Sequence, residues 1–254
     1  MTTEPGVQSN PTIRLEHVTK RFGGLTAVND VSMAVFPGEV VALAGDNGAG
    51  KSTLIKMISG VYRPDEGNIF LSDHEITMAS PMEARSLGIE TIYQDLALCE
   101  NLDASVNIFL GREPMRRLLV LFKQVDRSQM LSESQKVLDR LDIHIPNLRR
   151  PIREMSGGQR QAVAIARAVY WNARLVIMDE PTAALGVPEQ RKVHELIKTL
   201  RTQNVPVILI SHNLQDIFAV ADRIIVMRRG KKVGDVQASN VNDDDLVSMM
   251  VGSA

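Results

Sequence analysis

The chain has a single cysteine, Cys99, among its 254 residues. One cysteine cannot form a disulfide within the chain. Proteins of reducing compartments are typically free of disulfides. The cysteine content therefore predicts a protein that works in the cytoplasm.

Long apolar runs are also missing. A helix needs roughly 20 predominantly apolar residues to cross a bilayer. The longest bursts here, LLVLF at 118–122 and VPVILI at 205–210, have the length of a buried strand or helix face. The first residues, MTTEPGVQSNP, contain no positive region followed by an apolar run, so we expect no secretory signal. If the protein works at a membrane, we expect a partner to hold it there.

An excess of one charge is absent as well. The chain has 29 basic and 30 acidic side chains, for a formal net charge of −1. Without an overall basic field, the composition offers no support for a nucleic-acid partner. We expect none.

What the chain does contain is enough apolar material for a core, with 44% hydrophobic residues. Near-continuous apolar runs alternate with amphipathic helical patterns, which is typical of a parallel sheet with helical crossovers and predicts an α/β fold. Residues 95–159 differ, because helical patterns dominate there. The predicted organisation is one domain over 12–254, with a core of 12–94 and 160–254, a helical subdomain of 95–159 and a flexible start at 1–11.

A glycine-rich loop follows the apolar run EVVALAG. The segment GDNGAGKS spans Gly45 to Ser52 and opens the amphipathic helix KSTLIKMISG. In that setting the glycines let backbone N–H groups curl around phosphate oxygens, and the helix start adds partial positive charge. Lys51 can reach the outer phosphates and the Ser52 hydroxyl can bind Mg²⁺. The loop predicts a nucleoside triphosphate.

Two acids end a later apolar strand, LVIMDE. In a phosphate-loop protein, an acid at the end of a neighbouring strand can hold Mg²⁺, and Asp179 fits that role. Glu180 lies where the backbone leaves the sheet, so it can orient or deprotonate the attacking water. The pair therefore predicts hydrolysis beside the phosphate loop.

A second anion-binding helix start follows the helical region. In the segment MSGGQ, Ser156 and Gln159 have the spacing of a capping box, and Gly157 and Gly158 leave the first-turn N–H groups uncovered. The phosphate loop already provides a γ-phosphate site, so a second cradle suggests another molecule's phosphate. Two copies arranged head to tail would each offer SGGQ to the other's ATP.

With these segments in order, the sequence resembles the ATPases of ATP-binding-cassette (ABC) transporters from about residue 12 to its end. GDNGAGKS resembles the Walker A loop, LVIMDE resembles Walker B, and MSGGQ resembles the family signature, with Met155 where leucine is usual. Gln94 matches the Q-loop glutamine, His212 the switch histidine, and Phe22 the aromatic residue that lies against adenine. The order and spacing make the resemblance specific.

The resemblance implies a P-loop NTPase (RecA-like) core with an N-terminal antiparallel β region and an inserted helical subdomain. It also implies that two cassettes sandwich two ATP molecules with Mg²⁺, and that closure and hydrolysis move the membrane subunits. The expected catalytic residues are Glu180, His212, Lys51 and Gln94; the expected nucleotide-binding residues are Phe22, Gly45, Asn47, Gly48, Ala49, Gly50, Lys51, Ser52, Thr53, Ser156, Gly157, Gly158 and Gln159; and the expected metal ligands are Ser52, Gln94 and Asp179.

One position departs from the family pattern. The D-loop, usually of the SALD kind, reads AALG here and ends at Gly186. The acid that acts across the dimer in the family is absent, and glycine adds backbone freedom. We therefore expect communication between the two ATP sites to differ.

Within the family, the chain resembles cassettes of bacterial importers for simple sugars such as ribose, xylose and fructose. That resemblance implies self-pairing, a membrane permease that contacts residues 95–112, a periplasmic sugar-binding protein that acts indirectly, and a place on the inner face of the cell membrane. A branched-chain amino-acid importer is the nearest rival, since RFGGLTAVNDVS also suits that group. A soluble ABC ATPase acting on DNA or ribosomes and a P-loop kinase for a small metabolite remain open alternatives.

Overall fold

The computed structural model describes residues 10–117, 123–183 and 185–252. Its centre is a six-stranded sheet in which five strands are parallel and the edge strand β12 is antiparallel to β11. The predicted α/β class is confirmed. In sheet order the strands are β12 (Lys231–Gln237), β11 (Arg223–Arg228), β3 (Val40–Ala44), β10 (Val207–Ile210), β9 (Leu175–Asp179) and β6 (Ile89–Ile92).

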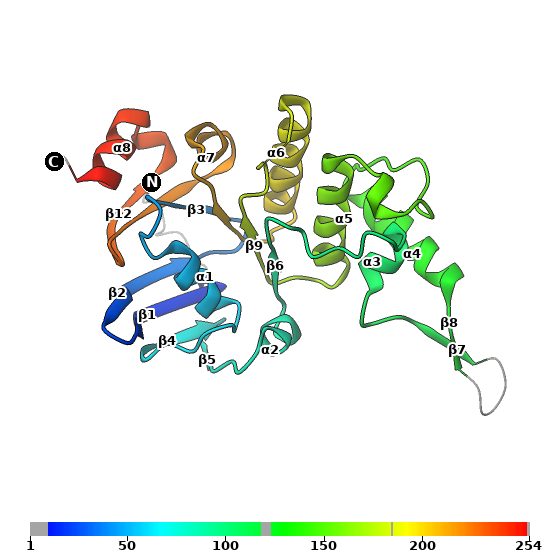
Figure 1. Ribbon diagram of the computed structural model, residues 1–254, viewed down its shortest axis with the longest axis horizontal. Helices are drawn as coiled ribbons and strands as arrows, with labels where there is room; N and C mark the ends of the chain where they lie inside the picture. Colours follow the sequence, from blue (N-terminus) through cyan, green and yellow to red (C-terminus); the bar gives the residue numbers. More distant parts are fainter. Residues whose placement is uncertain (1–9, 118–122, 184, 253–254) are drawn as a thin grey trace, which may run out of the picture.

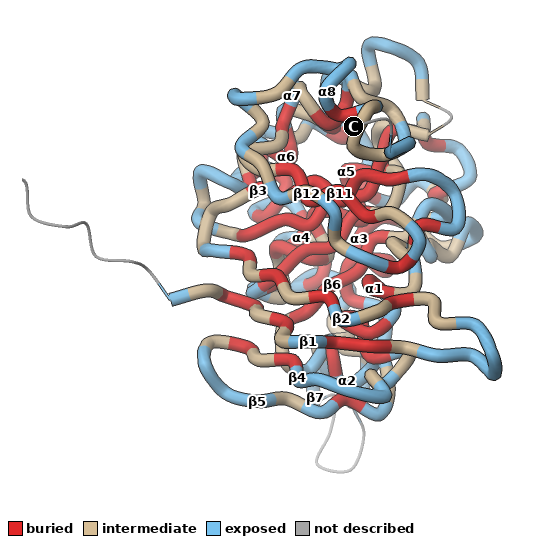
Figure 2. The backbone as a smooth tube through the Cα atoms, turned by 90° about the vertical axis from the view of Figure 1, so that its left-hand side faces the viewer, coloured by how far each residue is buried: buried red, intermediate tan, exposed pale blue. Residues whose placement is uncertain are grey.

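The central strands are buried on both faces, as their continuous apolar sequences predict. Every residue of β3 and β10 is buried. In β9, Leu175 and Ile177 face one apolar cluster, whereas Val176 and Met178 face another, because successive side chains of a strand point to opposite faces. The sheet thus separates two cores, and Figure 2 shows the buried backbone running through the middle of the molecule.

A second, antiparallel sheet covers one face of the molecule together with α1 (Figure 1). It confirms the expected N-terminal β region, and its first two strands form one long hairpin. Helix α1 (Lys51–Ile58) buries Leu54, Ile55 and Ile58, which is the face predicted from the sequence. The strands of the second sheet are β2 (Leu25–Val35), β1 (Ile13–Phe22), β4 (Glu66–Leu71) and β5 (His74–Ile76).

Helices cover the other face of the main sheet, where they share one apolar cluster with β9 and β10. In Figure 1, α5, α3 and α4 lie to the right of β9 and β6, whereas α7 lies to the left of α6. The stripe Val193, Leu196, Ile197 and Leu200 of α6 is buried as predicted. The helices that contribute to this cluster are α3 (Ala104–Phe109), α4 (Arg127–Arg140), α5 (Gly157–Tyr170), α6 (Val187–Thr202) and α7 (Leu214–Val220).

Residues 95–159 are less purely helical than predicted. Strands β7 (Met115–Arg117) and β8 (Lys123–Val125) form a small antiparallel hairpin between α3 and α4. The alternation of apolar and polar residues that marks a strand cannot be detected over three residues, so no strand was expected here. The division at residues 95 and 160 stays a prediction, and its second boundary falls inside α5. The apolar burst at 118–122 and most of the start at 1–11 lie outside the described residues.

Two further α-helices lie elsewhere: α2 (Pro81–Ser86) precedes β6, and α8 (Asp243–Val251) follows β12. Among the described residues, no helix is both long enough and apolar enough to cross a membrane.

Candidate functional site

The phosphate loop joins the end of β3 to the start of α1. Gly45, Gly48 and Gly50 all have positive φ angles, a conformation that L side chains rarely adopt. A Cβ on Gly45 would collide with the carbonyl oxygen of Met227, and one on Gly50 would lie 2.5 Å from that of Ala27. Glycine is therefore required at these two positions for geometric reasons.

The first turn of α1 leaves its N–H groups available. Its N-cap residue, Gly50, offers no side-chain hydrogen bond to the helix. A helix start of this kind binds anions through its free N–H groups and its dipole. The loop runs from Gly45 through Asp46, Asn47, Gly48 and Ala49 to Gly50, and the first turn of α1 holds Lys51, Ser52 and Thr53. Their role in binding a nucleotide stays a prediction.

Lys51 lies back across this loop. Its Nζ donates hydrogen bonds to the carbonyl oxygens of Gly45 at 2.5 Å and Asp46 at 3.0 Å. Burial lowers the pKa of Lys51, while the carboxylates of Glu180, Asp46 and Asp179 oppose that shift. The ammonium group is therefore within electrostatic range of both acids that end β9.

The two acids stand at the same edge of the sheet as the phosphate loop. Asp179 ends β9, opposite Ile210 of the parallel strand β10, and β10 also pairs with β3. Parallel strands end at one edge, so the chain brings the loop and the acids together. Burial raises the pKa of Asp179, the neighbouring charge of Glu180 raises it further, and Lys51 opposes both effects. A half-buried carboxylate of this kind is suited to a cation.

Glu180 and His212 are in direct contact. One carboxylate oxygen of Glu180 accepts a hydrogen bond from the backbone N–H of His212 at 3.0 Å, and the other lies 2.8 Å from the ring Nδ1. Glu180 has a φ of 51°, which is strained for a residue with a side chain. The predicted base and the predicted switch histidine therefore form one unit, although 32 positions separate them.

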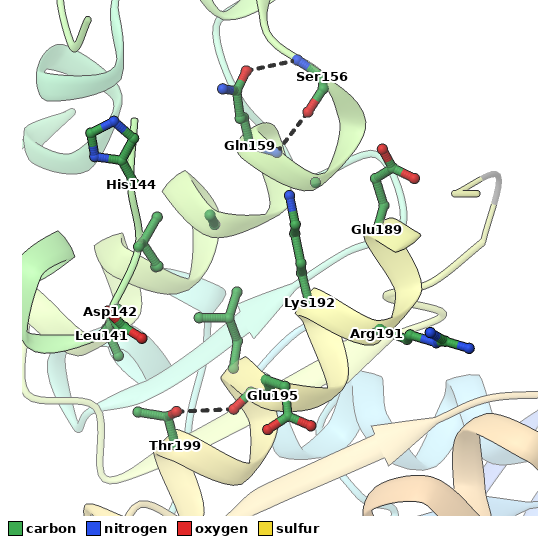
Figure 3. A pocket seen from close by; sticks show the side chains of 14 residues that line it. Leu141, Asp142, His144, Ser156, Gln159, Glu189, Arg191, Lys192, Glu195 and Thr199 are labelled. Carbon is green, nitrogen blue, oxygen red and sulfur yellow. Dashed lines mark hydrogen bonds between the residues drawn. The ribbon is translucent and has the colours of Figure 1, made fainter. Parts of the chain in front are cut away.

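The signature segment forms the helix start that its sequence predicts. The Ser156 hydroxyl accepts from the backbone N–H of Gln159, and the Gln159 side chain accepts from the backbone N–H of Ser156, which completes the capping box at the start of α5. Figure 3 shows this turn with Glu189 and Lys192 of α6 beside it. Ser156, Gly158 and Gln159 line a cleft of about 590 Å³ between α5 and α6.

Gln94 lies in a second cleft, of about 610 Å³, together with Glu180, Gly157 and Gly186. Neither this cleft nor the one in Figure 3 is lined by any residue of 45–53. Gln94 and Glu180 thus share a cleft with Gly157 of the signature segment, and the phosphate loop lines neither of these two clefts.

Phe22 ends β1 with 42% of its surface exposed. Its ring packs edge-on against Tyr62, with the ring centroids 5.1 Å apart. Sequence reasoning missed Tyr62, which follows the phosphate-loop helix. Its nearness to that helix in the sequence was the only available signal, because the pairing itself joins distant segments.

Residues 28–183 match the sequence profile of the ABC transporter family. The chain belongs to this family. It is 47% identical to the xylose/arabinose import ATP-binding protein of Sulfolobus acidocaldarius, over 95% of this chain and 94% of that protein. It is 44% identical to the fructose import ATP-binding protein of Rhizobium meliloti, over 96% of this chain and 95% of that protein.

Ribose import ATP-binding proteins match along only part of their length. The one from Jannaschia sp. is 40% identical over 98% of this chain, but the match covers 48% of that protein. The ABC chain described here thus spans about half the length of these relatives.

Solved structures agree on the fold. A crystal structure described as the ADP conformation of an ATP-binding cassette of an ABC transporter superposes with a TM-score of 0.81 at 27% identity, covering 95% of this chain and 99% of that one. A cassette described as a dimer bound to ADP and Pi gives a TM-score of 0.73 at 24% identity, over 89% of this chain and 98% of that one, which supports the fold alone. The protein is thus an ABC transporter ATPase, which binds ATP and couples its hydrolysis to transport.

Proposed function

We propose that this ABC ATPase drives the import of a simple sugar. The observation that carries the proposal is the match along nearly the whole chain to the xylose/arabinose and fructose import ATP-binding proteins. The solute itself would be bound by a membrane permease and, outside the cell, by a periplasmic sugar-binding protein. This chain would supply the energy.

ATP would bind with its phosphates in the loop at 45–53. The free N–H groups at the start of α1 and the Lys51 ammonium would neutralise phosphate charge. Lys51 would exchange its hydrogen bonds to the loop carbonyls for bonds to the nucleotide, since those carbonyls hold it at the phosphate position. The exposed ring of Phe22, backed by Tyr62, would stack on the adenine.

The donor set beside the loop suits Mg²⁺. The Ser52 hydroxyl, the Asp179 carboxylate and the Gln94 amide provide hard oxygen ligands, which magnesium prefers together with phosphate oxygens and water. The raised pKa of Asp179 supports this assignment, because a carboxylate that burial disfavours gains most from a cation. When bound, the ion would neutralise phosphate charge and orient the γ-phosphate.

Glu180 would orient or deprotonate the water that attacks the γ-phosphate. His212 contacts both carboxylate oxygens of Glu180, through its N–H and its ring. The histidine would therefore hold the base in place and reach the γ-phosphate from the same side.

The complete site would need two chains. In this chain the start of α1 already offers its own N–H groups to the phosphates, so the start of α5, with Ser156, Gly157, Gly158 and Gln159, is a second anion-binding helix start. A head-to-tail homodimer would bring the start of α5 from one copy to the γ-phosphate held by the other. Closure of the pair would then move the permease.

The permease would dock near residues 95–112, at the inner face of the cell membrane. This segment follows Gln94 and includes α3, which packs against α4 and α5. Movement of the permease would thus be transmitted to Gln94 and to Glu180, which lines the same cleft.

The dimer is tested with the Glu180→Gln variant, whose slow turnover would keep ATP in place. Light scattering should show a shift from monomer to dimer only with Mg·ATP. A variant that binds ATP at high occupancy and stays monomeric would contradict self-pairing.

The transported solute is tested by identifying the permease that co-purifies with this chain and reconstituting the pair in vesicles. Uptake of radiolabelled pentoses or hexoses that depends on ATP would support sugar import. Uptake of branched-chain amino acids instead would favour the rival importer class. ATPase activity that no permease alters would favour a soluble ABC ATPase.

A further inference from the structure

A buried polar network lies directly behind the contact between Glu180 and His212. The hydroxyl of Thr182 donates to Oδ2 of Asp216 at 2.5 Å, and the other oxygen of that carboxylate, Oδ1, lies 2.8 Å from Nε2 of His194. Thr182 and Asp216 are each 3% exposed. None of the three was singled out by the sequence, and none lines either cleft that the signature residues line.

The three residues come from three different elements. Thr182 lies in the turn after β9, two positions past Glu180. Asp216 lies in the first turn of α7, four positions past His212. His194 is in the middle of α6, which packs against α7. The network therefore connects the two segments that carry the reactive side chains, and attaches both to a long helix.

Side chains of these two segments make contact at two places. At the site, Glu180 contacts the backbone and the ring of His212. Behind the site, Thr182 contacts Asp216. The segments leave the paired strands β9 and β10, and the backbone N–H of Glu180 still donates to the carbonyl of Ile210 at 2.9 Å. The two side-chain contacts extend this alignment beyond the strand ends, where the reactive side chains lie.

The carboxylate of Asp216 has little freedom to move. A buried carboxylate must have both oxygens satisfied, because an unpaired buried charge is costly. Thr182 satisfies one oxygen and His194 the other. Since the carboxylate can only accept, Nε2 of His194 carries a proton, and the imidazole orients the acid. Removal of either donor would release the carboxylate to seek another partner and would shift the turn or α7.

We propose that Thr182, Asp216 and His194 are positioning residues for ATP hydrolysis. They hold Glu180, in its strained backbone conformation, at a fixed distance and angle from His212. They do so without touching the nucleotide. The inference depends on the roles proposed above for Glu180 and His212.

The first test compares two substitutions of Thr182. Thr182→Val keeps the shape of the side chain and removes its donor, whereas Thr182→Ser keeps the donor. We expect Thr182→Val to lower kcat by about 10- to 100-fold, as a small misplacement of a reacting group does, with little change in the KM for ATP. Thr182→Ser should recover most of the kcat. ATP affinity, measured by fluorescence of a labelled nucleotide, should be unchanged in both.

The second test applies the same logic to α6, where substitution is less disruptive because His194 is partly accessible. His194→Gln places an amide N–H close to the position of Nε2, and His194→Leu provides no donor. We expect kcat to fall in the leucine variant and to be largely kept in the glutamine variant. Thr182→Val and His194→Leu together should cost much less than the product of the separate losses, since both act through Asp216.

Glu180→Gln is measured in the same series. It distinguishes failure of the positioning role from failure of the proposed catalytic role of Glu180. If Glu180→Gln stops turnover but folded Thr182→Val and His194→Leu proteins retain full kcat, the positioning role is wrong and the proposed hydrolysis site stands. Equal losses in Thr182→Ser and Thr182→Val would also overturn it, because packing rather than the hydrogen bond would then matter. Full turnover in Glu180→Gln would overturn the role of Glu180 and this inference with it.

Discussion

Asp179 is held in a position that favours function at the expense of stability. Its pKa is raised above the ordinary value of 3.8 by burial and by Glu180. Between 3.8 and the raised value, the folded state binds more protons than the unfolded state, so the contribution of Asp179 to the free energy of unfolding falls as pH rises through that window. At pH values above the raised pKa, the burial of the charged Asp179 carboxylate lowers the free energy of unfolding by its full amount.

Asp179→Asn should therefore stabilise the nucleotide-free protein at pH 7, by about 1 kcal/mol, as substitutions that relieve active-site strain commonly do. The advantage over the unaltered protein should shrink as pH falls towards 4 and Asp179 of the unaltered protein becomes protonated. Urea titrations of both proteins at pH 7 and at pH 4 measure the difference in their free energies of unfolding. Lower stability of the variant at pH 7 would show that attraction to Lys51 outweighs burial.

Glu180→Gln should abolish turnover without preventing ATP binding. Loss of a general base costs about 10²- to 10⁴-fold in rate, and Glu180 is not expected to contact the nucleotide in the ground state. Phosphate release and nucleotide affinity are measured on the same preparation. Glu75→Gln, on the exposed strand β5, is the matched control and should behave as the unaltered protein. Weakened ATP affinity in Glu180→Gln would instead assign this acid to binding.

Among the helices, α5 has an N-terminal turn with two roles: its cap stabilises the fold, and its free N–H groups are proposed to bind the partner's phosphate. Ser156 caps α5, just as Asp126 caps α4 by accepting from the N–H of Gln129 at 3.0 Å. Ser156→Ala and Asp126→Ala should each destabilise the fold by about 1 kcal/mol, the usual cost of a lost cap. Only Ser156→Ala should also weaken ATP-driven dimerisation, because only its helix start is expected to meet the partner's phosphate.

The pair of variants is compared by thermal unfolding and by light scattering in the Glu180→Gln background. Equal loss of dimerisation in both variants would mean that stability, rather than the phosphate contact, governs assembly. No loss in either would contradict the proposed role of Ser156.

Elements were predictable where their signal is local. The amphipathic stripe of α6 and the capping box of α5 depend on residues three or four positions apart, and both are present. The hairpin of β7 and β8 was missed because each strand has three residues. The T-shaped pairing of Phe22 with Tyr62 was missed because it depends on the path of the chain between them.

For the whole molecule, ATP binding should raise stability through linkage. A ligand at 100 times its Kd adds about 2.7 kcal/mol to the free energy of unfolding when it binds only the folded state. Lys51→Ala should lose this increase while retaining the stability of the nucleotide-free protein within about 0.5 kcal/mol, since the lysine bonds only to its own loop.

The measurement is the shift of the thermal midpoint on addition of Mg·ATP. Lys198→Ala, at an exposed position of α6, is the control and should keep the shift. A normal shift in Lys51→Ala would remove this residue from the phosphate site.

By itself, the sequence determined which chemical groups the protein has and their local setting: the phosphate loop after an apolar strand, the acids ending another strand, and the capped helix of the signature. These are short-range features, because the chain's own geometry over a few residues decides them. The contact of Glu180 with His212, and the link that Asp216 makes between Thr182 and His194, follow from the tertiary structure alone. The physical reason is that such contacts depend on strand order and helix packing, which bring together residues more than ten positions apart.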